Sequence, residues 1–121
     1  MKLEDIKFKA KRLDGKGWAI GDLLHSYENG AIIVPIEGGG AFSVDPSTVC
    51  QFTGLKDEDG KEIYEGDLLA EKSFPMYEVG YIDGEFVASY IGENAFIFKL
   101  YALSNDCVVC GSIYDRKEGE K

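Results

Sequence analysis

The residues with the clearest chemical potential are three cysteines and one histidine. Cys107 and Cys110 have the spacing of a zinc or redox pair, and Cys50 and His25 would complete a Cys₃His metal site. However, the two valines between Cys107 and Cys110 favour a strand, in which side chains three positions apart point to opposite faces. We therefore predict no metal at these cysteines and interpret them as buried thiols. Three cysteines cannot all pair within one chain, which suits a reducing compartment.

Two further patterns resemble ligand-binding loops but lack the residues that those loops need. Asp57-Glu58-Asp59-Gly60 begins like a calcium loop, but Leu68 stands where an EF-hand needs its closing glutamate. Gly38-Gly39-Gly40 is not followed by the Gly-Lys-Ser/Thr of a phosphate loop. His25 is the only histidine, and no partner for acid–base chemistry can be assigned to it. We predict no catalytic residue and no cofactor, and an enzyme of unknown class ranks third among the functions considered.

The charge balance bears on the partners. Asp and Glu number 22 against 13 Lys and Arg, which gives a net charge of -9. Such a field repels nucleic acid and anionic membranes, and it favours solubility or a basic partner surface. The only basic cluster is Lys7, Lys9, Lys11 and Arg12. A nucleic-acid-binding small barrel that uses this stripe is therefore the second function considered, and nucleic acid is not the expected partner.

The chain has no segment that predicts a membrane or secretory location. No apolar run approaches the roughly 20 residues needed to span a bilayer. Residues 1–15 alternate charged with apolar residues and lack the continuous apolar segment of a signal peptide. We therefore expect the protein in the cytoplasm.

Alternating and β-branched segments predict many short strands joined by tight turns. Ile6 to Lys11 alternates strictly, and Trp18 to Ile20 resumes as a strand that Gly21-Asp22 is expected to break. Ala95 to Leu103 is ambiguous: a strand is favoured, and a short helix stays open. Further strands are expected at 31–36, 41–44, 48–53, 67–72, 77–81, 85–90 and 106–114, a helical turn at 45–47, and hairpin turns at 28–30 and 83–84. The aromatic residues expected in the core are Phe8, Trp18, Phe42, Phe52, Phe96 and Phe98.

The central stretch, residues 51–69 (QFTGLKDEDGKEIYEGDLL), combines an acidic turn with apolar flanks. Gly60 would take a positive φ in a two-residue turn with Asp59, and Gly66 would let the backbone change direction. Asp67 is expected to cap the amides freed at that point. The whole stretch can thus be explained as a folding device. The functional alternative is that Tyr64, Glu65 and Asp67 form a partner-binding surface beside the turn.

The same stretch carries a family resemblance. Residues 52–57 (FTGLKD) followed by residues 59–67 (DGKEIYEGD) are similar to the signature of the YopX-like proteins of bacteriophages and prophages. Residues 6–10 resemble the opening strand of that family and residues 111–114 its closing strand, although Lys11 stands where the family commonly has a tryptophan. The resemblance implies a small, mostly β protein that is partly similar to an SH3-like barrel. It also implies a phage-encoded protein of the bacterial cytoplasm, and it supplies no enzymatic activity.

These patterns predict an all-β or β-rich single domain over residues 1–121, with the glycine triplet near residues 38–46 as the place where a subdomain boundary could fall. The resemblance adds the expectation of a partly SH3-like barrel core. The expected function is that of a non-catalytic phage or prophage accessory protein that acts by protein–protein binding. Its partner would be another protein or, through exposed strand edges, a second copy of the chain.

Overall fold

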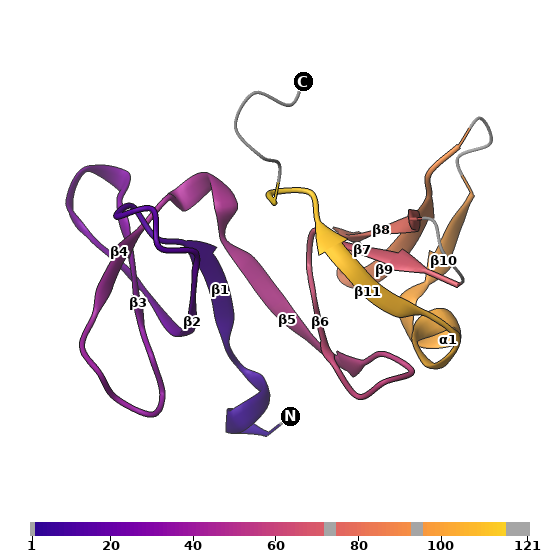
Figure 1. Cartoon of the computed structure of the whole chain (residues 1–121), viewed down its shortest axis with the longest axis horizontal. Coiled ribbons are helices and arrows are strands. Elements are labelled where there is room, and N and C mark those ends of the chain that lie inside the picture. Colours follow the sequence, from indigo (N-terminus) through magenta and orange to yellow (C-terminus); the bar gives the residue numbers. More distant parts are fainter. Residues whose placement is uncertain (1, 72–74, 93–95, 116–121) are drawn as a thin grey trace. The chain divides into compact units, whose positions relative to one another are not determined.

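The computed structural model describes residues 2–71, 75–92 and 96–115, which form two antiparallel sheets and one short helix (Figure 1). The chain divides into two compact units, Met1–Phe52 and Thr53–Lys121. The β-rich class expected from the sequence is confirmed. None of the helices in the described ranges is long and apolar enough to cross a membrane.

The first unit is built from short strands in the order β4-β3-β2-β1-β5. The strands are β1 Phe8–Lys11, β2 Trp18–His25, β3 Ala31–Val34, β4 Phe42–Val44 and β5 Cys50–Lys56, with 3₁₀ turns at Leu3–Asp5, Tyr27–Asn29 and Pro46–Thr48. β5 continues into the second unit, where β6 (Glu62–Tyr64) is its neighbour in the sheet. The boundary between the units therefore falls inside a strand.

The expectation that Gly21-Asp22 breaks the second strand is wrong, because β2 runs on to His25. A Cβ placed on Gly21 would lie 2.2 Å from the carbonyl oxygen of Val34 and 2.7 Å from the Cα of Pro35. Glycine at this position permits the close approach of the next strand to β2. The residue is thus a packing requirement within the sheet and not a strand terminator.

The hairpin turns expected from the sequence are confirmed. Between β2 and β3 the positive φ values fall on Glu28 (58°) and Asn29 (65°), whereas Gly30 has a φ of -80°. The other expected turn joins β8 to β9, and its positive φ values fall on Asp83 (52°) and Gly84 (85°). Asn and Asp tolerate this region better than other non-glycine residues do, so the turns lie where their chemistry predicts.

The segments around the prolines also agree with the sequence. β3 ends at Val34, directly before Pro35. The carboxylate of Asp45 accepts a hydrogen bond from the Ser47 N–H at 3.0 Å and caps the 3₁₀ turn Pro46–Thr48. The glycine triplet at 38–40 joins β3 to β4, which pair with each other, so it lies inside the first unit. That the whole chain acts as one domain stays a prediction.

The second unit contains a five-stranded sheet in the order β10-β9-β8-β7-β11. Its elements are β7 Asp67–Ala70, β8 Pro75–Ile82, β9 Glu85–Tyr90, β10 Ile97–Lys99, the helix α1 Leu100–Leu103, the 3₁₀ turn Ser104–Asp106 and β11 Val108–Ser112. The ambiguous segment, Ala95 to Leu103, divides into the strand β10 and the helix α1, and Ala95 itself lies outside the described residues. The part of the expected strand 67–72 beyond Glu71 also lies outside them.

No closed barrel is detected in the part of the chain that the structure describes. In the first unit, Arg12 nevertheless forms an isolated antiparallel bridge with Val44. The Leu13 N–H donates to the Ser43 carbonyl at 3.0 Å, and the Asp45 N–H donates to the Lys11 carbonyl at 2.8 Å. These bonds join the end of β1 to β4, the outermost strand of the same sheet. The buried core of this unit contains three alanines and two larger residues: Ala10, Ala19, Ala31, Ile33 and Val44.

Candidate functional site

The acidic turn of the central stretch is organised by the carboxylate of Asp57, whose residue is only 5% exposed. Its Oδ1 accepts hydrogen bonds from the N–H groups of Asp59 (2.9 Å) and Lys61 (2.8 Å). Its Oδ2 accepts one from the N–H of Val109 at 2.8 Å, a residue 52 positions away. Gly60 has a φ of 83°, as the turn requires. The carboxylate of Asp57 therefore ties the turn to β11. To bind calcium, this carboxylate would have to give up its hydrogen bonds to the three backbone N–H groups.

The predicted partner-binding residues do not share one exposed surface. Tyr64 is 4% exposed and Asp67 is 1% exposed, whereas Glu65 is partly exposed. Asp67 Oδ2 accepts the Tyr64 N–H at 2.8 Å, which confirms its capping role. The Tyr64 hydroxyl donates to a Glu62 carboxylate oxygen at 3.1 Å, and burial raises the pKa of Tyr64 far above its usual range. Exposure of Tyr64 was a wrong assumption, while a binding role for these residues stays a prediction.

The cysteine pair is divided between core and surface. Cys107 precedes β11 and is fully buried, and burial raises the pKa of its thiol to about 11. Cys110 lies within β11 and is exposed, so the expectation that it is a buried thiol is wrong. Cys50 is buried in the first unit, where its Sγ lies 3.2 Å from the Thr48 carbonyl oxygen. Within the described ranges no three His, Cys, Asp or Glu side chains are grouped to hold a metal ion.

The basic stripe is engaged by aromatic rings of the first unit. Lys9 Nζ and Lys11 Nζ lie 4.5 Å and 4.7 Å from the centroid of the Trp18 ring, and Lys7 Nζ lies 4.9 Å from that of Phe52. Such cation–π contacts hold the ammonium groups against the rings, and each lysine keeps its positive charge. Arg12, the fourth residue of the predicted basic cluster, does not continue this row of lysines.

Arg12 differs from the three lysines in position and in contacts. The lysines are spaced two residues apart, whereas Arg12 directly follows Lys11 and lies over the ring of Phe42. Its guanidinium carbon is 4.1 Å from the centroid of Phe42, and its Nη2 is paired with the carboxylate of Asp14. That guanidinium lowers the pKa of Asp14. The basic stripe therefore consists of the alternating lysines Lys7, Lys9 and Lys11 alone.

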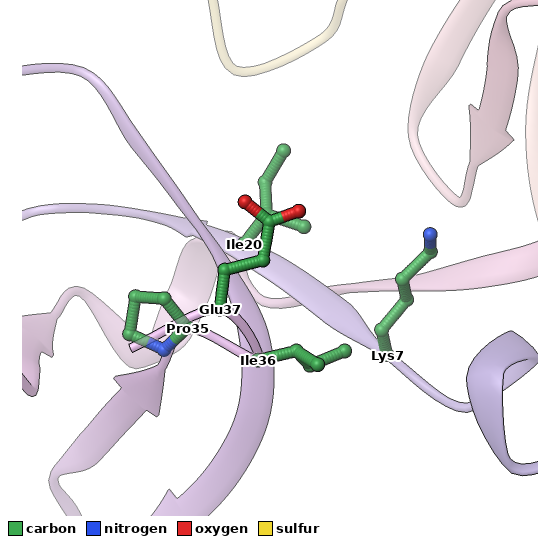
Figure 2. Close-up of a pocket in the computed structure, with 5 residues that line it drawn as sticks. All are labelled: Lys7, Ile20, Pro35, Ile36 and Glu37. Carbon is green, nitrogen blue, oxygen red and sulfur yellow. The ribbon is translucent and has the colours of Figure 1, made fainter. Parts of the chain in front are cut away.

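A pocket of about 280 Å³ lies in the first unit, next to the segment that follows β3 (Figure 2). Ile20, Pro35 and Ile36 supply apolar surface, and Lys7 and Glu37 supply charges of opposite sign. Figure 2 shows the Ile36 side chain extending toward Lys7. The lining of this pocket therefore offers a mixed apolar and charged contact surface.

Among the described residues of the second unit, large apolar side chains are exposed in succession around β10, the end strand of its sheet. All three residues of β10 are exposed, and Ile97 and Phe98 are 56% and 40% exposed. Phe96 before the strand and Tyr101 after it are 58% and 67% exposed. The strand pairs with β9 on one side, and no described strand pairs with its other side (Figure 1). We call Phe96, Ile97, Phe98 and Tyr101 the β10 edge patch.

Comparison with protein families decides the identity of the chain. A family model described as YopX protein matches residues 7–118. The chain belongs to the YopX family. This finding confirms the resemblance that residues 52–67 carry. A search of curated proteins finds no match.

The match to the YopX model includes both units, so each surface described above lies within the family region. The sequence had marked Phe96 and Phe98 as core residues, and that interpretation is wrong because both are exposed. The signal that was available is the run of residues 96–98, which carries three large apolar side chains in succession where a short strand begins. A half-buried strand alternates apolar with polar residues, so such a run indicates either full burial or an exposed contact surface.

Proposed function

We propose that this YopX-family protein is a non-catalytic phage or prophage accessory protein that binds another protein in the bacterial cytoplasm. The observation that carries the proposal is the β10 edge patch, which combines exposed large apolar side chains with an unpaired strand edge. Soluble proteins keep such edges short, charged or covered, because an open apolar edge pairs with other chains. Here only Lys99 adds a charge to the strand.

The titratable residues of the chain support binding better than they support catalysis. The buried carboxylates of Asp57 and Asp67 accept backbone hydrogen bonds and so are occupied in holding turns. The only histidine, His25, lies exposed at the end of β2. A catalytic site needs titratable groups that converge in a cleft, and binding needs only a complementary surface.

The proposal is tested by capture of proteins from a host lysate with the intact chain and with two matched variants. Ile97→Lys places a charge on the open edge, and Leu24→Lys makes the same change at an exposed apolar residue of β2 in the first unit. We expect proteins captured by the parent chain to be lost with Ile97→Lys and retained with Leu24→Lys. Loss with Leu24→Lys alone would assign binding to the first unit, and equal capture by both would remove β10 from the proposal.

A nucleic-acid-binding small barrel is the second candidate, and the distribution of charge is the observation that favours it. Residues 1–52 hold six Lys and Arg against seven Asp and Glu, a net charge of -1, whereas residues 53–121 hold seven against fifteen, a net charge of -8. The repulsion that the whole chain exerts on phosphates thus comes from the second unit. The bonds between the end of β1 and β4 support a partly closed, SH3-like arrangement of the first unit.

Titration with duplex and single-stranded DNA at several salt concentrations separates the two candidates. We expect no binding tighter than about 10⁻⁶ M at physiological salt, because a stripe of three lysines would contact few phosphates and so release few counterions. Tighter, salt-dependent binding that is lost in a Lys9→Gln, Lys11→Gln double variant would promote the nucleic-acid function instead.

A further inference from the structure

The backbone of β10 presents hydrogen-bonding groups on its open side. The Tyr90 N–H donates to the Phe96 carbonyl at 2.8 Å, and Ile97 and Phe98 stand opposite Ser89 and Ala88 of β9. Antiparallel neighbours alternate between hydrogen-bonded and non-hydrogen-bonded pairs. Phe96 and Phe98 therefore direct their N–H and C=O groups toward β9, and Ile97 directs its own toward the open edge.

The side chains of the patch lie on both faces of the sheet at this edge. The rings of Phe96 and Phe98 are 6.5 Å apart, and Phe98 also meets the ring of Tyr77 edge-on at 5.8 Å. Ile97 points to the opposite face because side chains alternate along a strand. An extended segment that pairs with Ile97 would thus place its own alternating side chains beside Phe98 on one face and Ile97 on the other.

Charge selects among the segments that could pair there. The second unit has a net charge of -8. The one base of the strand, Lys99, is already paired with Glu85 at 3.4 Å. On β9, Ser89 stands opposite Ile97 of β10 and also opposite Glu78 of β8. Residues that stand opposite each other point to the same face of a sheet, so the exposed Glu78 lies on the same face as Ile97. A second copy of the chain would bring two acidic units together, whereas a basic segment would meet opposite charge.

We infer that the β10 edge binds an extended, lysine- or arginine-bearing segment of a partner protein, which adds to the sheet as a further strand. The inference rests on the proposed function and deepens it by stating the class and conformation of the partner. Main-chain hydrogen bonds to Ile97 supply part of the affinity, and apolar side chains that alternate with basic ones supply the selection.

The first experiment uses synthetic peptides, so it does not depend on finding the natural partner. One short peptide alternates lysine with valine, a second alternates glutamate with valine, and a third is the lysine peptide with every backbone amide N-methylated, so that neither of its edges can donate a strand hydrogen bond. We expect the lysine peptide to bind and to slow hydrogen exchange of the Ile97 amide. The glutamate peptide and the N-methylated peptide should bind at least about ten-fold more weakly, since each loses either the charge match or the strand hydrogen bonds.

Variants at one position separate strand addition from simple charge attraction. Ile97→Pro removes only the outward N–H and leaves the bonds of Phe96 and Phe98 to β9 in place, and Ile97→Val keeps that N–H. We expect about ten-fold weaker peptide binding by Ile97→Pro and unchanged binding by Ile97→Val. Native-like far-UV circular dichroism of Ile97→Pro shows that the sheet persists. If Ile97→Pro unfolds, the N-methylated peptide carries the same test from the ligand side.

Three results would overturn the inference. They are equal binding of the lysine and glutamate peptides, binding of the lysine peptide without protection of the Ile97 amide, and no binding of any peptide. A fourth is self-association of the chain alone, seen by sedimentation, with the Ile97 amide already protected, which would make a second copy the occupant. Each of these leaves the proposed function standing if capture from the lysate is still lost with Ile97→Lys, so the two failures are distinguishable.

Discussion

The two units of the chain are both small antiparallel β structures, yet their interiors differ. The buried core of the first unit is made of Ala10, Ala19, Ala31, Ile33 and Val44. The core of the second is made of larger residues, Ile63, Leu69, Tyr77, Val79, Ala88, Leu100 and Cys107. Hydrophobic stabilisation scales with buried apolar area, so the second unit has the larger contribution from its core.

The units also differ in how they use charge. In the second unit, buried carboxylates hold turns through backbone N–H groups, as Asp57 and Asp67 do. In the first unit, charged groups lie over aromatic rings at the surface, as Lys9 and Lys11 do over Trp18. Loss of a buried acceptor costs more than loss of a surface contact, because it leaves donors unsatisfied away from water. Substitutions should therefore have their largest effects in the second unit.

The largest effect is expected for Asp57→Ala. This change removes the acceptor of three backbone N–H groups and the link from the turn to Val109. We expect it to lower the free energy of unfolding by about 4 kcal/mol, since each donor left unsatisfied costs about 1–3 kcal/mol. The matched change in the first unit is Asp45→Ala, which removes an exposed cap and should cost only about 1 kcal/mol. Urea unfolding of both variants measures the difference, and equal costs would contradict the contrast between the units.

The same experiment tests whether the chain is one domain. Trp18 is the only tryptophan and lies in the first unit, whereas six of the seven tyrosines lie in the second. The single-domain prediction requires tryptophan fluorescence and tyrosine circular dichroism to shift together in Asp57→Ala. A shift of the tyrosine signal alone would show that the units unfold separately.

The next effect in size is expected for Tyr64→Ala. The side chain of Tyr64 is buried beside Asp67 in the second unit, so its truncation should cost about 3 kcal/mol. Tyr64→Phe removes only the hydroxyl bond to Glu62 and should cost about 1 kcal/mol. Glu65→Ala, at a partly exposed residue, should stay within about 0.5 kcal/mol of the parent. A Tyr64→Ala protein with the stability of the parent would return Tyr64 to the surface interpretation.

Tyr64 also shows where prediction from the sequence reaches its limit. Turn chemistry is local, so the positive φ of Gly60, the cap by Asp67 and the turn at Asp83 and Gly84 could be predicted from residue types alone. Whether an aromatic side chain faces the core depends on strand pairings distant in sequence. This is why the partner-binding alternative placed Tyr64 at the surface and why Phe98 was expected in the core, each the reverse of what the structure shows.

Gly21 and Asp57 illustrate the same limit for other residue types. The need for glycine at Gly21 comes from the backbone of Val34 and Pro35 on the next strand, which no local pattern around Gly21 encodes. The bond from Asp57 to Val109 joins residues 52 positions apart, so the acidic turn was recognised while its anchor was not. The candidate site at β10 depends on sheet order in the same way, because only the order of strands makes it an edge.

The third-largest effect, after those of Asp57→Ala and Tyr64→Ala, is expected to be a loss of stability at alkaline pH. Burial raises the pKa of Cys107 from 9.0 to about 11, so the folded state keeps its proton where the unfolded state has lost it. The stabilisation is complete below pH 9 and is lost as the pH rises through about 11, a change of about 2–3 kcal/mol. Burial raises the pKa of Tyr64 and Tyr77 as well, and these act in the same direction.

Urea unfolding followed by far-UV circular dichroism at pH about 8 and about 11 measures this loss. The matched variant is Cys107→Ala, which removes the titrating thiol and should show a smaller alkaline loss than the parent. Burial also raises the pKa of Cys110, by less than that of Cys107, so Cys110→Ala should lose more stability than Cys107→Ala does and less than the parent. An identical loss in Cys107→Ala and the parent would show that the thiol is not the group responsible.

The smallest effect is expected at the surface of the first unit. Lys9→Gln and Lys11→Gln each remove an ammonium group that lies within 5 Å of the Trp18 ring centroid, and each should cost about 0.5–1 kcal/mol. Because both lysines also carry other interactions, the contact itself is isolated by a double-mutant cycle of Lys9→Gln with Trp18→Leu. A coupling energy of about 0.5 kcal/mol that persists in high salt is expected, since the ring excludes water from one side of the ammonium. A coupling energy as large as the loss measured for Asp57→Ala would contradict the contrast between the units. Surface cation–π contacts of the first unit would then stabilise the protein as much as the buried carboxylates of the second unit do.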